Sequence, residues 1–244
     1  MRTHEASRQR PGPNPGDFDD RHRARLLEIV DIAAGLFAKR GFSATGVNEL
    51  GEAVGLGRGA LYHYIGSKAN LLAQIHQRIM EPLQAALDQI LVAPVTWAAK
   101  LRLASINHLA IQVSMLDHSR VITAEFKHLL PAQLEEYERA RLGYEHSWAV
   151  ILEGGQAAGE FEIEDLSITR LALLGMHNFT VQWIQPRGAM SAAEISRHYC
   201  RTVMTGIARS VDWTALDNEV QAASELLRAD SDLDSEPANS LHSQ

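Results

Sequence analysis

Cysteine is nearly absent from this chain: Cys200 is the only one among its 244 residues. A single thiol excludes an intramolecular disulfide framework and a cysteine-rich zinc site, and it suits a reducing compartment. No apolar run approaches the roughly 18 residues of a membrane span, and the N-terminus lacks the apolar core of a signal peptide. We therefore expect a cytoplasmic protein that does not contact a membrane.

The motifs that mark common enzyme classes are also missing. The sequence has no nucleophile elbow, no P-loop and no glycine-rich dinucleotide turn. His108, His118 and His128 lie ten residues apart, which is not the spacing of metal ligands on one helix, and no thiol lies near them. We therefore predict that the protein is not an enzyme and that it uses no cofactor and no metal.

Positive charge is scarce overall, because the net charge is −7. An acidic total argues at first against nucleic acid as a partner, yet binding depends on the local patch that faces the phosphates. Residues 1–80 carry a balance of +3, whereas residues 81–244 carry one of −10. The N-terminal third can therefore bind DNA although the whole chain is acidic.

Helical periodicity dominates the chain, and no stretch alternates as a β-strand does. We predict an all-α fold in four parts. These are a disordered, basic and proline-rich arm over residues 1–20, a three-helix DNA-binding domain over 21–66, a larger helical domain over 67–212, and an extension with an acidic tail over 213–244.

Helix boundaries follow from caps and breakers. Ser67, Asp165 and Ser191 are predicted N-caps, the last with the form of a capping box. Pro82 is expected to kink or offset the fourth helix. We expect the first helix over 21–40, the later ones near 95–114, 119–129, 131–154, 165–184 and 191–211, and a candidate for one more over 213–228.

The stretch from Thr45 to Leu72 organises the rest of the chain. It predicts two short helices, over 47–53 and 58–64, joined by a tight turn and followed by a longer helix. Thr45 is the expected N-cap of the first short helix, and Gly55 stands where a helix commonly ends in a left-handed residue. This arrangement is a helix-turn-helix, whose second helix enters the major groove of DNA.

At these residues the sequence resembles the TetR family of transcriptional regulators. The resemblance implies a DNA-binding domain, dimerisation through the last two helices of the larger domain, and an enclosed small-molecule pocket. A helical turn that merely looks like a DNA reader is the alternative. The matching positions are Thr45, Leu50-Gly51, Val54-Gly55-Leu56-Gly57, Gly59, Leu61-Tyr62, Tyr64-Ile65, Lys68 and Leu71-Leu72, together with the run from Ile29 to Phe42.

The sequence departs from the family pattern at Gly46, Asn48, Gly51 and Gly57, where threonine, arginine, alanine and a serine or threonine cap are usual. Each glycine inside a helix costs roughly 0.5–1 kcal/mol relative to alanine. We therefore expect a loosely ordered reading head that becomes more ordered on DNA.

Several side chains of this stretch are predicted to contact DNA. Arg58 can read guanine through a bidentate pair of hydrogen bonds, or it can hold a phosphate. Gly59 and Ala60 lack bulk and let the helix approach the groove. By the resemblance, Tyr62 and Lys68 contact the backbone. The full predicted set is Thr45, Asn48, Arg58, Gly59, Ala60, Tyr62, His63 and Lys68.

Polar and aromatic residues inside apolar helices of the larger domain are candidates for an effector site, although each could instead pack in the core. They are His108, Gln112, Met115, Phe126, Tyr144, Trp148, His177, Asn178 and Trp183. The predicted dimer face consists of Leu166, Leu171, Leu174, Met176, Phe179 and Trp183 on one helix, and Ile195, Tyr199, Val203 and Ile207 on the next. A monomer that buries these faces internally is the alternative.

The segment from Val181 to Gly188, with its Trp183, Pro186 and Gly188, resembles a TetR subgroup that regulates lipid, acyl-CoA or steroid breakdown. This resemblance implies an apolar or acyl-CoA effector. We therefore predict a ligand-responsive repressor that binds a palindromic operator on double-stranded DNA as a homodimer. An activator, or a DNA-binding protein without an effector, is the alternative.

Overall fold

The computed structural model describes residues 15–185, 188–208 and 210–233. Within these ranges the chain is helical, and its only β pairing is an isolated bridge between Phe161 and Ala208. The predicted all-α class is confirmed. Most of the predicted N-terminal arm and the end of the acidic tail lie outside the described residues. Residues 15–20, which were assigned to the arm, belong to the first helix instead.

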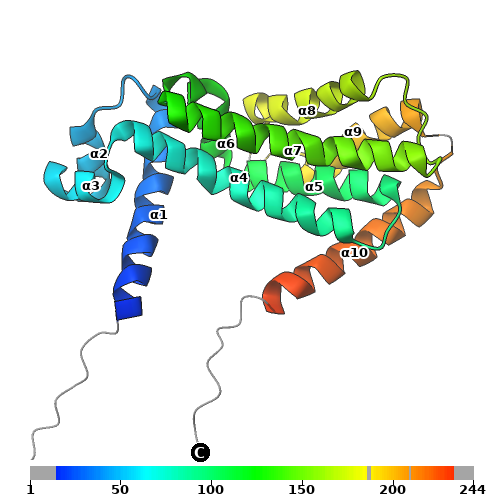
Figure 1. Ribbon diagram of the computed structural model, residues 1–244, viewed down its shortest axis with the longest axis horizontal. Coiled ribbons are helices and arrows are strands. Elements are labelled where there is room, and N and C mark those ends of the chain that lie inside the picture. Colours follow the sequence, from blue (N-terminus) through cyan, green and yellow to red (C-terminus); the bar gives the residue numbers. More distant parts are fainter. Residues whose placement is uncertain (1–14, 186–187, 209, 234–244) are drawn as a thin grey trace, which may run out of the picture.

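Three helices form the predicted reading head at one end of the molecule (Figure 1): α1 (Pro15–Arg40), α2 (Val47–Val54) and α3 (Arg58–Ile65). Their apolar faces meet in one core, in which Ile29, Phe37, Leu50 and Leu61 are fully buried. α2 ends at Gly55, whose φ of 68° is the left-handed conformation expected there. The helix-turn-helix therefore rests on a well-packed apolar core.

A single helix, α4 (Lys68–Val92), leads from the head into the larger domain (Figure 1). Its predicted cap is confirmed, because the Ser67 hydroxyl accepts a hydrogen bond from the Asn70 N–H at 3.0 Å. Pro82 lies inside α4 and does not end it. Leu71 and Ile75 pack in the core of the head, whereas the later part of α4 packs in the core of the larger domain. The helix is therefore common to both domains.

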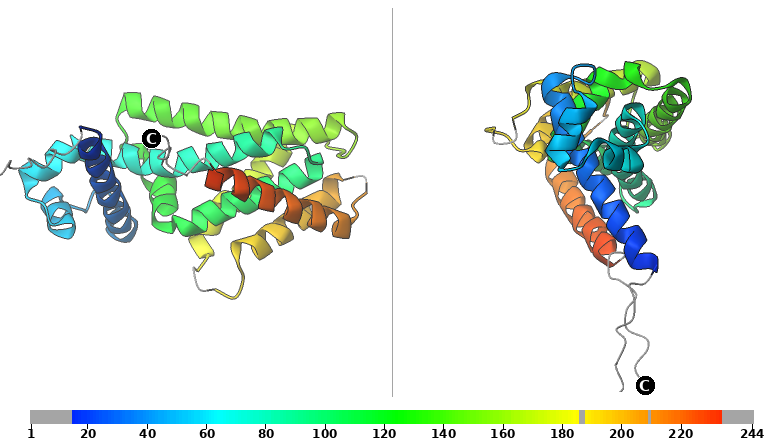
Figure 2. Two further views of the ribbon diagram at one scale, coloured as in Figure 1. Left: turned by 90° about the horizontal axis from the view of Figure 1, so that it is seen from below. Right: turned by 90° about the vertical axis from the view of Figure 1, so that its left-hand side faces the viewer.

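The larger domain is built around α5 (Trp97–Ser114), which contacts α4 and each of the later α-helices (Figures 1 and 2). The fully buried Trp148 lies in its core. The predicted caps Asp165 and Ser191 are confirmed, the latter as a complete capping box. The remaining helices are α6 (Leu116–Glu125), the short 3-10 helix η1 (Phe126–His128), α7 (Pro131–Ala157), α8 (Leu166–Trp183), α9 (Ala192–Ile207) and α10 (Trp213–Leu233).

Candidate DNA-reading head and effector cavity

The short helix α3 presents its first turn to solvent. Arg58, Gly59, Ala60 and His63 are exposed, and Tyr62 is half-buried with the Arg58 guanidinium 5.7 Å from its ring centroid. On the opposite side Leu61 is fully buried. Arg58, Tyr62 and His63 therefore reach the surface of α3, and the small residues Gly59 and Ala60 leave its first turn without bulky side chains. The predicted DNA contacts require both features.

Thr45 is not the N-cap of α2 that the sequence predicted. Its side chain is only 1% exposed, and its hydroxyl donates a hydrogen bond to the Gly41 carbonyl at 2.9 Å. The N-cap of α2 is Gly46, which makes no side-chain cap. The threonine therefore closes the loop after α1, because a buried hydroxyl needs a partner, and a DNA contact by Thr45 stays a prediction. Asn48, in contrast, is exposed on α2.

Lys68 begins α4 as predicted, but its ammonium is directed into the head. Nζ donates to the Phe42 carbonyl and lies 4.2 Å from the centroid of the Phe42 ring. Burial lowers the pKa of Lys68, and the nearby carboxylate of Glu125 partly opposes this. A phosphate contact by Lys68 stays a prediction. It requires the ammonium to contact a phosphate while it donates to the Phe42 carbonyl, or to leave that carbonyl.

A cavity of about 200 Å³ lies inside the larger domain between α4, α5, α6, α7 and α8. Five predicted effector residues line it: His108, Gln112, Phe126, Tyr144 and Asn178. Apolar side chains complete its wall, among them Ile79, Leu83, Ile122 and Leu174. The sequence therefore predicted several polar residues of one cavity, although they come from three helices, α5, α7 and α8, that are distant along the chain.

Buried imidazoles form the base of this region. The Nδ1 atom of His108 lies 2.7 Å from the Tyr144 hydroxyl, and Nε2 of His177 lies 2.7 Å from the Ser105 hydroxyl. Burial lowers the pKa of His177 to about 4 and the pKa of His108 well below its usual value. Both rings are therefore neutral at neutral pH and can each donate and accept one hydrogen bond. Asn178 lies close enough to raise the pKa of His108 slightly, but Nε2 of His108 has no hydrogen-bond partner.

The other four predicted effector residues do not line the cavity. Trp148 and His177 are fully buried behind His108, with ring centroids 6.0 Å and 5.2 Å from it. Met115 joins α5 to α6 and packs against the main core. Trp183 ends α8 and is 48% exposed. Aromatic character alone did not distinguish a cavity wall from a core or from an outer surface.

Helix α6 has one face on the cavity and another on the reading head. Ser119, Ile122 and Thr123 line the cavity. From the same short helix, Nε2 of His118 lies 3.0 Å from a carboxylate oxygen of Asp31 in α1, and Glu125 accepts a hydrogen bond from the Phe42 N–H at 3.2 Å. Any shift of α6 that is caused from inside the cavity would therefore displace groups that hold the head.

An apolar stripe runs along the outer face of α8. Ile168, Leu171, Phe179 and Trp183 are 62%, 52%, 65% and 48% exposed, and Gly175 lies among them with open space in front of it. Their spacing of three and four residues places them on one side of the helix. The assignment of Leu174 and Ile195 to the predicted dimer face was wrong, since both side chains pack inside their own chain.

Both domains match known families. A family model described as "Bacterial regulatory proteins, tetR family" matches residues 29–75, and one described as "Tetracyclin repressor-like, C-terminal domain" matches residues 94–207. The chain belongs to the TetR family of transcriptional regulators. Neither the head nor the larger domain is that of an enzyme.

Individual relatives of this TetR-family regulator include the HTH-type transcriptional repressor KstR2 of Rhodococcus jostii, 29% identical over 201 residues that cover 80% of this chain and 97% of the relative. The structure of the ketosteroid transcriptional regulator KstR2 of Mycobacterium tuberculosis superposes with a TM-score of 0.71 at 21% identity, covering 76% of this chain and 96% of the other. The structure of AibR in complex with isovaleryl coenzyme A and operator DNA superposes with a TM-score of 0.66 at 19% identity, covering 74% of this chain and 97% of the other. The two structural likenesses show the fold.

Five polar residues of the cavity in this TetR-family regulator were not predicted from the sequence: Ser119, Thr123, Tyr137, Arg141 and Glu145. Arg141 and Glu145 pair one helical turn apart, and Arg170 binds the same carboxylate. From sequence, such a pair is indistinguishable from an ordinary pair on a solvated helix face.

No helix within the described ranges has an apolar stretch long enough to cross a membrane.

Proposed function

We propose that this protein is a ligand-responsive transcriptional repressor that acts in the cytoplasm. It binds a palindromic operator as a homodimer, and a small effector of apolar or acyl-CoA type releases it. The observation that supports this best is the double role of α4 and α6. Each helix contributes residues to the wall of the cavity and residues to the packing of the reading head. Occupancy of the cavity and DNA binding can therefore favour different positions of the same two helices, which is what coupling requires.

The cavity favours an effector with a compact apolar end. An apolar protein cavity of about 150 Å³ holds benzene, so about 200 Å³ suits a ring or a short branched chain. Gln112, Asn178 and the neutral imidazole of His108 offer it a few hydrogen bonds. The name of the KstR2 relative supports a ring-bearing effector, and the AibR complex supports a fold that accommodates an acyl-CoA and DNA.

The outer face of α8 supports a dimer. Its stripe of large apolar side chains is suited to burial against the same stripe of a second copy, as in a two-fold four-helix interface. Two reading heads related by such an axis would read two half-sites of opposite direction, spaced by the turn of the DNA.

The test is DNA binding with and without effector. We expect a fluorescent duplex from upstream of the protein's own gene to bind in a salt-sensitive manner, and ketosteroids or acyl-CoA thioesters to release it. The variant Ile122→Trp, which fills the cavity from α6, should act as a permanent effector and lower the affinity for this DNA even without effector, whereas Ile122→Val should respond as the wild type does. If Ile122→Trp binds the DNA and is released as readily as wild type, the effector does not act through this cavity. If no compound of either class releases the DNA, the proposed effector class is wrong.

A further inference from the structure

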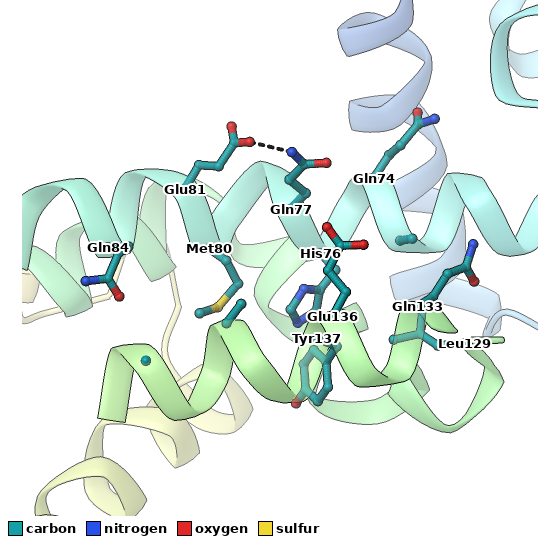
Figure 3. A pocket seen from close by; sticks show the side chains of 13 residues that line it. Gln74, His76, Gln77, Met80, Glu81, Gln84, Leu129, Gln133, Glu136 and Tyr137 are labelled. Carbon is teal, nitrogen blue, oxygen red and sulfur yellow. Dashed lines mark hydrogen bonds between the residues drawn. The ribbon is translucent and has the colours of Figure 1, made fainter. Parts of the chain in front are cut away.

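A groove of about 440 Å³ lies between α4 and α7, beside the cavity described above (Figure 3). Its α4 side consists of Gln74, His76, Gln77, Met80 and Glu81, and Figure 3 shows His76 directed across toward Tyr137 of α7. Met80 and Tyr137 also line the cavity. These two side chains therefore separate the groove from the cavity, and the two spaces adjoin one another.

The groove has a distinctive chemistry. Four glutamine side chains line it, from Gln74, Gln77, Gln84 and Gln133. The amide nitrogens of the last three donate to Glu81, Asp88 and Asn70, respectively. Two carboxylates, Glu81 and Glu136, lie along it, and no lysine or arginine is present among the described residues that line it. Amides donate and accept hydrogen bonds, whereas the carboxylates repel anions. The lining therefore suits a neutral ligand that carries amides or hydroxyls, and it disfavours a phosphate.

Two buried polar atoms of the groove lack a hydrogen-bond partner among the described residues. His76 is only 7% exposed, and its Nε2 atom has no hydrogen-bond partner. Its ring meets the Tyr137 ring edge to face with centroids 4.1 Å apart. The Oε1 atom of Gln74, a second residue of the lining, also lacks a partner. Native proteins leave few buried polar atoms unsatisfied, and such atoms point to a ligand or a functional role.

We propose that the groove is the outer half of the effector site. The apolar end of the effector occupies the cavity, and a neutral arm bearing amides or hydroxyls passes Met80 and Tyr137 and lies in the groove, where it hydrogen-bonds to His76 and to the glutamines. This inference rests on the proposed function, because it requires that the cavity takes an effector. Any phosphates that such a molecule carries lie beyond the groove.

The experiment uses four probes that share one acyl group: octanoic acid, octanoyl-N-acetylcysteamine, octanoyl-pantetheine and octanoyl-CoA. Affinity for the full-length protein is measured by calorimetry. We expect octanoyl-pantetheine to bind about three- to tenfold more tightly than octanoyl-N-acetylcysteamine, which is equally uncharged, as one net hydrogen bond allows. We expect pantetheine and CoA thioesters to bind equally within about threefold, because the phosphates gain nothing in the groove.

Two variants locate the arm. Gln77→Ala should weaken octanoyl-pantetheine by about three- to tenfold and leave octanoic acid unchanged. Gln89→Ala is the matched control, because Gln89 is an exposed glutamine on another face of α4 and does not line the groove. His76→Phe should weaken octanoyl-pantetheine in the same manner without lowering thermal stability, since it removes an unsatisfied buried nitrogen. A histidine with only a structural role would lose stability and would leave the difference between the probes unchanged.

The outcomes separate the two proposals. Equal binding of octanoic acid and octanoyl-pantetheine overturns the role of the groove and leaves an apolar effector intact. A large preference for CoA over pantetheine overturns the neutral arm. If none of the four probes binds, the acyl effector of the proposed function fails, and the arm fails with it.

Discussion

A carboxylate oxygen of Asp31 lies 3.0 Å from Nε2 of His118, and the guanidinium of Arg78 approaches the same oxygen at 3.6 Å. One residue of α1 therefore contacts both α6 and α4, two helices that also line the proposed effector cavity. Burial lowers the pKa of His118, and the Asp31 carboxylate partly opposes this effect. Asp31 thus acts as a joint between the reading head and the part of the chain that surrounds the cavity.

Replacing Asp31 by alanine should loosen the head without unfolding it. Because Asp31 is 49% exposed, its pairs are worth at most about 1 kcal/mol. We expect amide exchange in the C-terminal half of α1 to accelerate by about three- to fivefold, with little change in α7. Asp88→Ala, on the outer surface of α4, is the control. Unaltered exchange in α1 would show that Asp31 does not hold the head.

Two glycines of the head should respond in opposite ways to alanine. A Cβ at Gly51 would lie 2.6 Å from the Leu56 carbonyl oxygen, whereas a Cβ at Gly59 meets nothing within 4 Å. We expect Gly59→Ala to stabilise the fold by roughly 0.5 kcal/mol and Gly51→Ala to destabilise it by about 1–3 kcal/mol. Chemical denaturation measures both. Equal effects of the two substitutions would mean that the α2–α3 turn has room that the structure does not show.

This contrast shows what the sequence could and could not predict. The helix-turn-helix follows from local signals, and the left-handed Gly55 and the Ser67 cap are confirmed. Gly51 was read as a weak point of a helix, because the close approach of Leu56 belongs to the packed turn and leaves no periodic signal. The loose head inferred from its glycines stays a prediction.

The cavity illustrates the same limit. Its polar points lie on four helices, so spacing along the chain does not reveal which of them meet. His108, Tyr144 and Asn178 were identified because polar residues in apolar helices are unusual. Arg141 and Glu145 were missed because they also form an ordinary helical pair. Thr45 was predicted as an N-cap, whose hydroxyl would accept from a backbone N–H, whereas the hydroxyl donates to the Gly41 carbonyl instead.

Arg58 and Lys68 should differ in what their removal costs. Arg58→Ala should relax specificity at one base pair by about 1–3 kcal/mol per half-site if the side chain reads guanine. Lys68→Ala should weaken all DNA sequences alike and lower the salt slope by about one per half-site. Because Lys68 also holds the Phe42 carbonyl, its variant should melt earlier. Titrations with operator and unrelated duplexes distinguish the two, and uniform weakening by both would demote Arg58 to a phosphate contact.

Acid should destabilise the protein through its buried histidines. Burial lowers the pKa of His76 and of His177 to about 4, whereas in the unfolded chain both titrate near 6.5. The unfolded state therefore binds more protons between these values. Stability is complete above about pH 6.5 and falls by roughly 1 kcal/mol per pH unit for each histidine toward about pH 4. In the variant His76→Phe, the free energy of unfolding should depend less steeply on pH, by the contribution of one histidine. An unchanged slope of this free energy against pH would contradict the low pKa of His76.

Phe179 and Leu226 offer a matched test of the dimer face, since both are 65% exposed. Phe179 belongs to the stripe on α8, whereas Leu226 lies on α10, away from that stripe. We expect Phe179→Glu to convert the dimer to a monomer, because two carboxylates would be buried against an apolar face at a cost of several kcal/mol. Leu226→Glu should leave the mass unchanged. Light scattering after gel filtration measures the mass, and operator affinity should fall steeply only for Phe179→Glu, since a monomer reads one half-site. If both variants remain dimeric, the α8 stripe does not form the interface, and if Leu226→Glu alone dissociates, the interface lies on α10.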